Sequence, residues 1–218
     1  MKLKYSKKEL VFSCHTESEK LELVKQLTEK IKFVDMTISS SLMRVKVTLY
    51  GPRDRIKFAV EEAKAIFKRI RQSMYPGANG LYTYDLGIVT EKCGRSTSIE
   101  DLERLLKLKG YKVKVINDEQ IKTNASLNEL TSLVLKFWNA YEEGFYVQPK
   151  SIRKLIAAIS AALDMQFENV LKVAFEKELL KKVQNGRYGI TMPLERVIVE
   201  IVKSIKGAIN ESKGVGED

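Results

Sequence analysis

Apolar positions in the first third of the chain follow two spacings that together predict a βαββα unit. Alternating runs indicate strands, and stripes at helical spacing indicate helices. The clearest strand covers residues 42–50, where Val45, Val47 and Leu49 share one face. Gly51-Pro52 ends this strand and starts a helix. The predicted elements are a strand at 8–14, a helix capped by Thr16 or Ser18 with apolar positions from Leu21 to Ile31, strands at 34–38 and 42–50 joined by three serines, and a helix at 53–71.

The same order is predicted again in the middle third. A strand at 81–89 precedes a helix at 98–109, strands at 111–116 and 119–124, and a helix at 126–143. Two similar units of about 65 residues fit an internal duplication. In an alternative pairing, the strand at 81–89 closes the first unit as a ferredoxin-like βαββαβ sheet. The sequence leaves both pairings open.

The last third has the pattern of a winged helix-turn-helix. Helices are predicted at 151–163 and 167–180, with a short break between them, and Asn185-Gly186 predicts a hairpin within 179–191. A final helix is expected at 193–207, followed by a frayed tail. The expected fold is therefore α+β, with tandem βαββα units, KH-like or ferredoxin-like, followed by a winged-helix domain. The expected domains are residues 1–76, 77–145 and 146–218.

The charge distribution favours an anionic partner for the first unit. The chain carries a net charge of +10. Residues 1–72 hold 17 basic and 9 acidic side chains, whereas 73–144 hold 9 and 10, and 145–218 hold 12 and 9. A basic surface of this kind is a requirement for nucleic-acid binding.

Candidate nucleic-acid contacts in the first unit come from one strand and the helix that follows it. Tyr50, Tyr75, Tyr82 and Tyr84 add possible stacking surfaces. The competing interpretation is a solvated helix face on which Glu61 pairs with Lys57 or Lys64. The candidate cations are Arg44 and Lys46 on the strand, and Arg53, Arg55, Lys57, Lys64, Lys68, Arg69 and Arg71 on the helix.

Two loops and the predicted wing supply further candidates. Gly77 and Gly80 match the G-x-x-G pattern with which KH domains clamp nucleotides, although an ordinary helix-to-strand connection uses the same residues. Lys92 and Arg95 precede a helix start that could hold a phosphate, but a capping box of Thr97 and Glu100 competes for the same donors. The wing candidates are Lys181, Lys182 and Arg187, with Arg153 and Lys154 nearby. Residues 166–180 carry a net charge of −1, so sequence-specific DNA reading is not expected.

Several function classes lack sequence support. Cys14 and Cys93 lie far apart without Cys-x-x-Cys spacing, so neither a disulfide framework nor a zinc site is expected. His15 follows Cys14 directly, and adjacent strand residues point to opposite faces. No phosphate-binding loop, metalloprotease or nucleophile-elbow motif is present, so we expect no enzyme and no cofactor. No apolar run is long enough to span a membrane and no signal-peptide core is present, so a cytoplasmic location is expected.

Three segments resemble a family of archaeal proteins of unknown function. They are Gly110-Tyr111-Lys112-Val113, Lys122-Thr123-Asn124-Ala125 and the hairpin at 179–191. The resemblance spans nearly the whole chain, implies an archaeal, cytoplasmic setting, and transfers no catalytic residue.

The expected function is non-enzymatic binding of RNA, either a structured RNA or one associated with the ribosome. Two alternatives stay open. One is a protein-interaction adaptor that docks a partner or forms a homodimer through the C-terminal winged helix. The other is a DNA-binding regulator.

Overall fold

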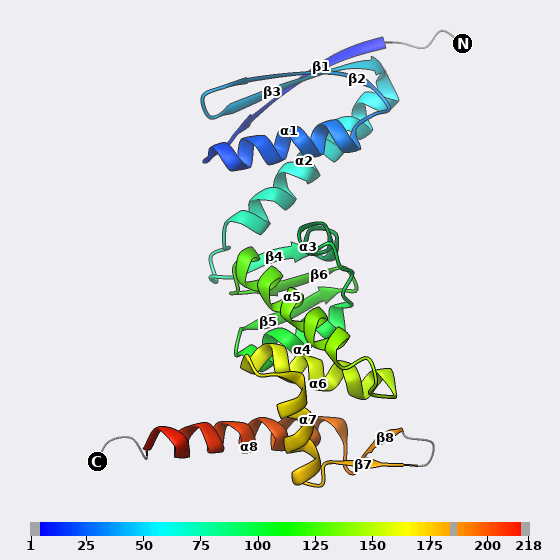
Figure 1. Cartoon of the computed structure of the whole chain (residues 1–218). Helices are drawn as coiled ribbons and strands as arrows, with labels where there is room; N and C mark the ends of the chain where they lie inside the picture. The colour runs from blue at the N-terminus through cyan, green and yellow to red at the C-terminus, as the bar shows by residue number, and fades with distance from the viewer. Residues whose placement is uncertain (1–4, 184–186, 215–218) are drawn as a thin grey trace. The chain divides into compact units, whose positions relative to one another are not determined.

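The computed structural model describes residues 5–183 and 187–214, and side chains up to residue 207 (Figure 1). The chain forms two compact units, Met1–Tyr84 and Asp85–Asp218. The described residues contain eight helices and three small sheets, so the fold is α+β as expected. The expected division into three domains, at 76/77 and 145/146, stays a prediction.

The first unit has the predicted βαββα order. Its elements are β1 (Tyr5–Ser13), α1 (Glu17–Lys30), β2 (Asp35–Ser41), β3 (Arg44–Pro52) and α2 (Arg53–Met74). The strands form an antiparallel sheet in the order β1-β3-β2. Thr16 is the N-cap of α1 and accepts a hydrogen bond from the Glu19 amide, which decides between the two predicted caps.

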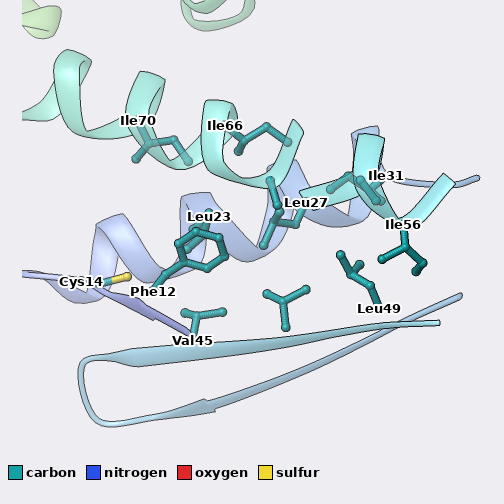
Figure 2. Packing of buried hydrophobic residues seen from close by; sticks show 13 residues of the cluster. Phe12, Cys14, Leu23, Leu27, Ile31, Val45, Leu49, Ile56, Ile66 and Ile70 are labelled. Carbon is teal, nitrogen blue, oxygen red and sulfur yellow. The ribbon is translucent and has the colours of Figure 1, made fainter. Parts of the chain in front are cut away.

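The core of the first unit lies between one face of this sheet and both helices. Figure 2 shows side chains from the sheet pointing toward α1 and α2. Its buried members include Phe12, Val45, Val47 and Leu49 from the sheet, Leu23 and Leu27 from α1, and Ile66 and Ile70 from α2. Burial of each such side chain contributes about 1.5–3 kcal/mol. Because both helices cover the same face, the other face of the sheet is left open, as antiparallel sheets allow (Figure 1).

The connection between β2 and β3 differs from the prediction. The three serines that were expected to form the turn belong to β2, and Ser39 and Ser41 lie opposite Lys46 and Arg44. The turn instead uses Leu42, which has φ 42° and is 91% exposed. Serine side chains on the open face of an edge strand need no burial, so this strand continues beyond its apolar alternation.

The strand that crosses the boundary between the two units is shorter than predicted. β4 (Tyr82–Asp85) ends where α3 (Leu86–Cys93) begins, so the prediction of one strand at 81–89 is wrong. Val89 and Cys93 are buried one turn apart, and Gly94 ends the helix with φ 64°. β4 lies beside β6 in a second sheet of order β4-β6-β5, so the ferredoxin-like closure of the first sheet is also wrong.

The remaining elements of the middle third follow the predicted order. They are α4 (Ile99–Lys109), β5 (Val113–Asn117), β6 (Gln120–Thr123) and α5 (Leu127–Glu143). Both three-stranded sheets place the third strand of their unit in the centre. The elements of the middle third, from β4 to α5, include an additional helix, α3, so their order is βααββα. The predicted repeat of the βαββα order is therefore wrong at this helix.

The C-terminal third contains α6 (Lys150–Leu163), α7 (Phe167–Glu176), β7 (Leu180–Lys182), β8 (Tyr188–Ile190) and α8 (Leu194–Gly214). β7 and β8 pair antiparallel, as predicted for a hairpin, while the Asn185-Gly186 turn lies outside the described residues. α7 ends four residues before its predicted end, two residues before Glu178, which has φ 55°. α8 continues past its predicted end at Gly207.

α6 is the central helix of the second unit. Ten of its residues are buried, and it packs against α4, α5 and α7. It ends at Asp164 in the left-handed conformation, where the carboxylate accepts hydrogen bonds from Lys109, at 2.6 Å, and from Lys136. None of the helices in the described ranges combines the length and apolar character that crossing a lipid bilayer requires.

Candidate nucleic-acid interface

Four cations form a stripe along one side of α2. Arg53, Lys57, Lys64 and Lys68 are spaced by four, seven and four residues, which places them on one side of a helix. The stripe extends for about 22 Å at 1.5 Å per residue. All four side chains are exposed, because the core side of α2 is formed by Ile56, Ala59, Ala63, Ile66 and Ile70. We refer to these four cations as the α2 stripe.

The α2 stripe is not neutralised by neighbouring acids. Within the described residues, no ion pair shorter than 4 Å involves any of its four members. Glu61, one turn from both Lys57 and Lys64, pairs with neither. The pairing of Glu61 with Lys57 or Lys64, on which the competing interpretation of α2 depends, is therefore absent among the described residues.

The other predicted cations of α2 lie outside the stripe. Arg55 is exposed on another side of the helix. Arg69 donates to Glu62 at 3.1 Å. Arg71 donates through Nε to Glu19 at 3.1 Å and lies with its guanidinium 5.1 Å from the Phe67 ring centre. Arg69 and Arg71 are therefore already held by carboxylates within the fold.

Glu19 is the centre of a buried polar network between α1 and α2. Its side chain is fully buried. One carboxylate oxygen accepts from Arg71, and the other accepts from the Tyr75 hydroxyl at 3.2 Å and from the His15 amide at 2.6 Å. The Tyr75 hydroxyl also lies 3.4 Å from Thr16 Oγ1, and the His15 ring contacts Arg71. Tyr75 was predicted to contact bases, but its hydroxyl donates a hydrogen bond to Glu19 within the fold.

Neither cysteine has the environment of an activated nucleophile. Burial raises the pKa of the Cys14 thiol, and Glu19 adds to this effect against the opposing charge of Arg71. Burial also raises the pKa of Cys93. Reactive cysteines have a lowered pKa instead. Both thiols are free, and His15 is exposed beside the buried Cys14.

Arg44 and Lys46 lie on the open face of the first sheet, away from the α2 stripe. They alternate with the core residues Val45 and Val47, whereas α2 covers the opposite face of the sheet (Figure 1). The sequence placed these residues near the α2 cations because they are close along the chain. The structure separates them into two surfaces.

The Gly77–Gly80 loop is a closed turn between α2 and β4. The Gly77 amide donates to the Leu81 carbonyl at 2.9 Å, and the Gly80 amide donates to the Gly77 carbonyl at 2.8 Å. Asn79 Oδ1 accepts from the Leu81 amide at 3.3 Å. The two glycine amides are therefore used within the loop itself.

The loop between α3 and α4 contains the predicted phosphate contacts Lys92 and Arg95. Ser98, and not Thr97, is the N-cap of α4, and it accepts from the Asp101 amide. The predicted capping box is therefore wrong by one residue, because the Thr97 hydroxyl accepts from the Trp138 indole at 3.1 Å instead. Arg95 pairs with Glu142 at 2.7 Å. Lys92 is exposed.

The wing candidates Lys181, Lys182 and Arg187 are all exposed. Arg153 and Lys154 on α6 are less available to contact a nucleic acid, because both already have contacts within the fold. Arg153 is buried, lies 4.3 Å from the Tyr141 ring centre and donates to the Phe145 carbonyl, while Lys154 pairs with Asp101 at 2.6 Å.

Two aromatic positions change the picture of stacking surfaces. Tyr84 is fully buried and Tyr82 stacks on it, so Tyr84 is not a surface for bases. Phe58 on α2 is 64% exposed and was not among the predicted stacking surfaces. The signal was present, because Phe58 lies outside the helical spacing of Ile56, Val60, Ala63 and Phe67.

A comparison with models of known protein families shows which family the chain belongs to. Residues 12–211 match the family model described as "Uncharacterized protein conserved in archaea (DUF2067)". The chain belongs to this family. The match confirms the resemblance to an archaeal family of unknown function and covers both structural units. Searches of the curated proteins and of the solved structures give no significant match.

Proposed function

We propose that this member of the archaeal family binds RNA without catalysing a reaction, and that the α2 stripe is the main contact. The observation that carries the proposal is the row of four exposed cations without ion-pair partners among the described residues. Phosphate oxygens are the natural partners of such a row, since each contact releases counterions from the RNA. A structured or ribosome-associated RNA in the cytoplasm fits this chemistry.

The α2 stripe is expected to position RNA and not to read its sequence. Phosphate contacts fix the register of a protein on a nucleic acid but do not distinguish bases. Phe58, which is 64% exposed on α2, can add an apolar surface near the stripe. Binding through this helix should therefore include both single-stranded and duplex RNA.

Neutralising two members of the stripe tests the proposal. The double substitution Lys64→Gln, Lys68→Gln should weaken binding of a fluorescent oligouridine about 10-fold at low salt. It should also reduce the slope of log K against log salt by about 1.4, since each single-strand contact contributes about 0.7. Fluorescence anisotropy over about 50 to 200 mM salt measures both quantities.

The matched control is Lys30→Gln, Lys32→Gln, which removes the same charge from exposed positions after the core stretch of α1. The control should change the affinity by less than about 2-fold. Equal losses in both variants, or no RNA binding by the unchanged protein, would contradict the assignment of the stripe.

A KH-like nature of the middle third is part of the proposal. It is supported by the helix–glycine–helix connection at Gly94, since KH domains clamp nucleotides with a glycine loop. The loop has only the first glycine of the pattern, and Arg95 and Thr97 are already bonded. We therefore assign it a smaller share of the binding than the α2 stripe.

A protein-interaction role is a second candidate, which a different observation favours. A pocket of about 660 Å³ lies between α7 and the β7–β8 hairpin. Its lining combines Tyr146, Leu171, Phe175 and Tyr188 with the polar residues Glu168, Asn169, Lys172, Glu176 and Lys182. Phe145, whose ring contacts that of the lining residue Tyr146, is 71% exposed. Apolar exposure of this kind marks interaction sites. By contrast, α7 exposes Glu168 and pairs its Lys172 with Glu176, which does not favour the DNA-binding alternative.

Light scattering tests homodimer formation at this surface. The unchanged protein should have the mass of a dimer, and Phe145→Ser should have the mass of a monomer, because the exposed ring contributes apolar area to the contact. Leu135→Ser, at another exposed apolar position, serves as the control. A monomeric mass for the unchanged protein would contradict the dimer.

A further inference from the structure

The open face of the first sheet carries an ordered set of side chains across all three strands. The register places Lys7 of β1 and Asp35 of β2 on either side of Tyr50, and Val11 and Ser39 on either side of Lys46. Residues directly opposite on adjacent strands have neighbouring side chains on one face. We define the open sheet face by its outward residues: Tyr5, Lys7, Glu9, Val11 and Ser13 on β1, Arg44, Lys46, Thr48 and Tyr50 on β3, and Asp35, Thr37, Ser39 and Ser41 on β2.

One end of this face is aromatic. Tyr50 lies on the central strand and is 39% exposed, and Tyr5 on the edge strand is 74% exposed. Tyr5 lies opposite Pro52, one position along the same face from Tyr50. The Lys7 ammonium lies 5.6 Å from the Tyr50 ring centre. An exposed ring with a cation beside it is the arrangement on which nucleic-acid bases stack.

The centre of the face holds cations around one carboxylate. Glu9 pairs with Lys7 and with Lys46, each at 2.9 Å. Hydrogen bonds from Lys46 and Lys7 lower the pKa of Glu9 to about 2, so the carboxylate is ionised near neutral pH. No ion pair of Arg44 occurs among the described residues, and its neighbours across the strands are Ser13 and Ser41. Phosphate groups can therefore bind Arg44 directly and compete with Glu9 for the two lysines.

We propose that the open sheet face binds unpaired bases of single-stranded RNA, with Tyr50 as the stacking surface and Lys7, Lys46 and Arg44 as the phosphate contacts. The inference rests on the proposed RNA binding for its class of partner, but it concerns a different surface. A duplex is excluded as the occupant because its bases are stacked inside the helix and its major groove is too deep and narrow to be read. A protein partner with an apolar surface fits less well, since it would remove water from the Lys7–Glu9–Lys46 ion pairs.

The test compares one substitution on two RNA probes. Tyr50→Leu should weaken binding of oligouridine about 5- to 150-fold, the range for loss of one stacked base. It should leave binding of an RNA duplex of matched length unchanged, because the duplex contacts the α2 stripe. Tyr50→Phe keeps the ring and should bind oligouridine like the unchanged protein. Urea unfolding of both variants separates loss of binding from loss of structure.

A second substitution should increase affinity. Glu9→Gln removes the carboxylate that holds Lys7 and Lys46, so oligouridine should bind more tightly and with a steeper salt dependence. Its matched control is Glu29→Gln, which removes the same charge from an exposed position of α1. Binding of the duplex should respond equally and weakly to both substitutions.

The outcomes distinguish this inference from the proposed function. One outcome is that the double variant Lys64→Gln, Lys68→Gln weakens binding of both probes while Tyr50→Leu and Glu9→Gln change the binding of neither. In that case the proposed function stands and the inference is overturned. If Tyr50→Leu weakens both probes equally, the effect is structural and the inference is again overturned. Absence of binding to either probe by the unchanged protein overturns both.

Discussion

Replacing Gly144 with alanine is expected to destabilise the second unit by about 1–3 kcal/mol, the usual cost of overpacking a core. Gly144 is buried at the end of α5, and a Cβ atom there would lie 2.2 Å from Cζ of Phe167 and within 2.7 Å of two more ring atoms. Phe167 is itself only 1% exposed, so its ring has no free space to enter. The substitution must therefore displace the ring or the end of α5.

Urea unfolding followed by tryptophan fluorescence measures this effect. Trp138 is the single tryptophan of the chain and lies in α5, so the signal reports on the second unit. Gly207→Ala is the control, because a Cβ atom at this α8 position meets no atom within 4 Å. It should not destabilise the protein, since alanine favours helix over glycine.

A double mutant identifies the Phe167 ring as the cause. Phe167→Leu alone should destabilise the unit by leaving a cavity. Gly144→Ala should lower the free energy of unfolding less in the Phe167→Leu variant than in the unchanged protein. The new methyl group can then occupy the space left by the ring. Additive effects would show that the two residues do not compete for space.

Replacing Glu19 with alanine is expected to destabilise the first unit by about 2–3 kcal/mol. Removing one partner of a buried ion pair costs about 3–5 kcal/mol, and the Arg71 side chain is 38% exposed, so water offsets part of this cost. The substitution also removes the acceptor for the Tyr75 hydroxyl and the His15 amide. Glu19→Gln keeps the shape of the side chain and should cost about 1 kcal/mol.

Hydrogen exchange of the α1 and α2 amides, read by mass spectrometry, localises this loss of stability. Exchange should accelerate in both helices for Glu19→Ala but not for Glu29→Ala, which changes an exposed glutamate of the same helix. A double-mutant cycle of Glu19→Ala and Arg71→Gln should give a coupling of at least about 0.5 kcal/mol. Unchanged exchange in α2 would show that the network does not join the two helices.

The network also separates structural cations from binding cations. Arg71→Gln should lower stability while leaving the RNA affinity of the folded protein nearly unchanged. Lys68→Gln should do the opposite, since Lys68 belongs to the α2 stripe and has no ion-pair partner among the described residues.

The sequence predicted local elements well where one periodicity was unbroken. The alternation of Val45, Val47 and Leu49 predicted both β3 and its buried face, and the spacing of Ile56, Ala63 and Ile70 predicted the core side of α2. Prediction failed where an apolar run was short. Residues 81–89 were read as one strand because strand and helix share such runs, and the structure divides them between β4 and α3.

The sequence predicted most residues of the candidate site but not how they are arranged in space. Counting charges identified the first third and most of its cations, including every member of the α2 stripe. It could not show that Arg71 and Tyr75 are held by Glu19, because these contacts join residues 52 and 56 positions apart. Phe58 was not predicted as a contact, although its position outside the helical spacing of the core residues of α2 indicates an exposed side chain.

The sequence by itself determined the order of most elements, the inward faces of β3 and α2, and the basic character of the first unit, because each depends on spacing within one segment. The tertiary structure alone decided that the cations of β3 and those of the α2 stripe lie on different surfaces. Since α1 and α2 pack on one face of the first sheet, Arg44 and Lys46 remain on the open sheet face while Lys64 and Lys68 point away from α2 on the other side. Packing of elements far apart along the chain, and not their local pattern, therefore sets the two surfaces that we propose for RNA.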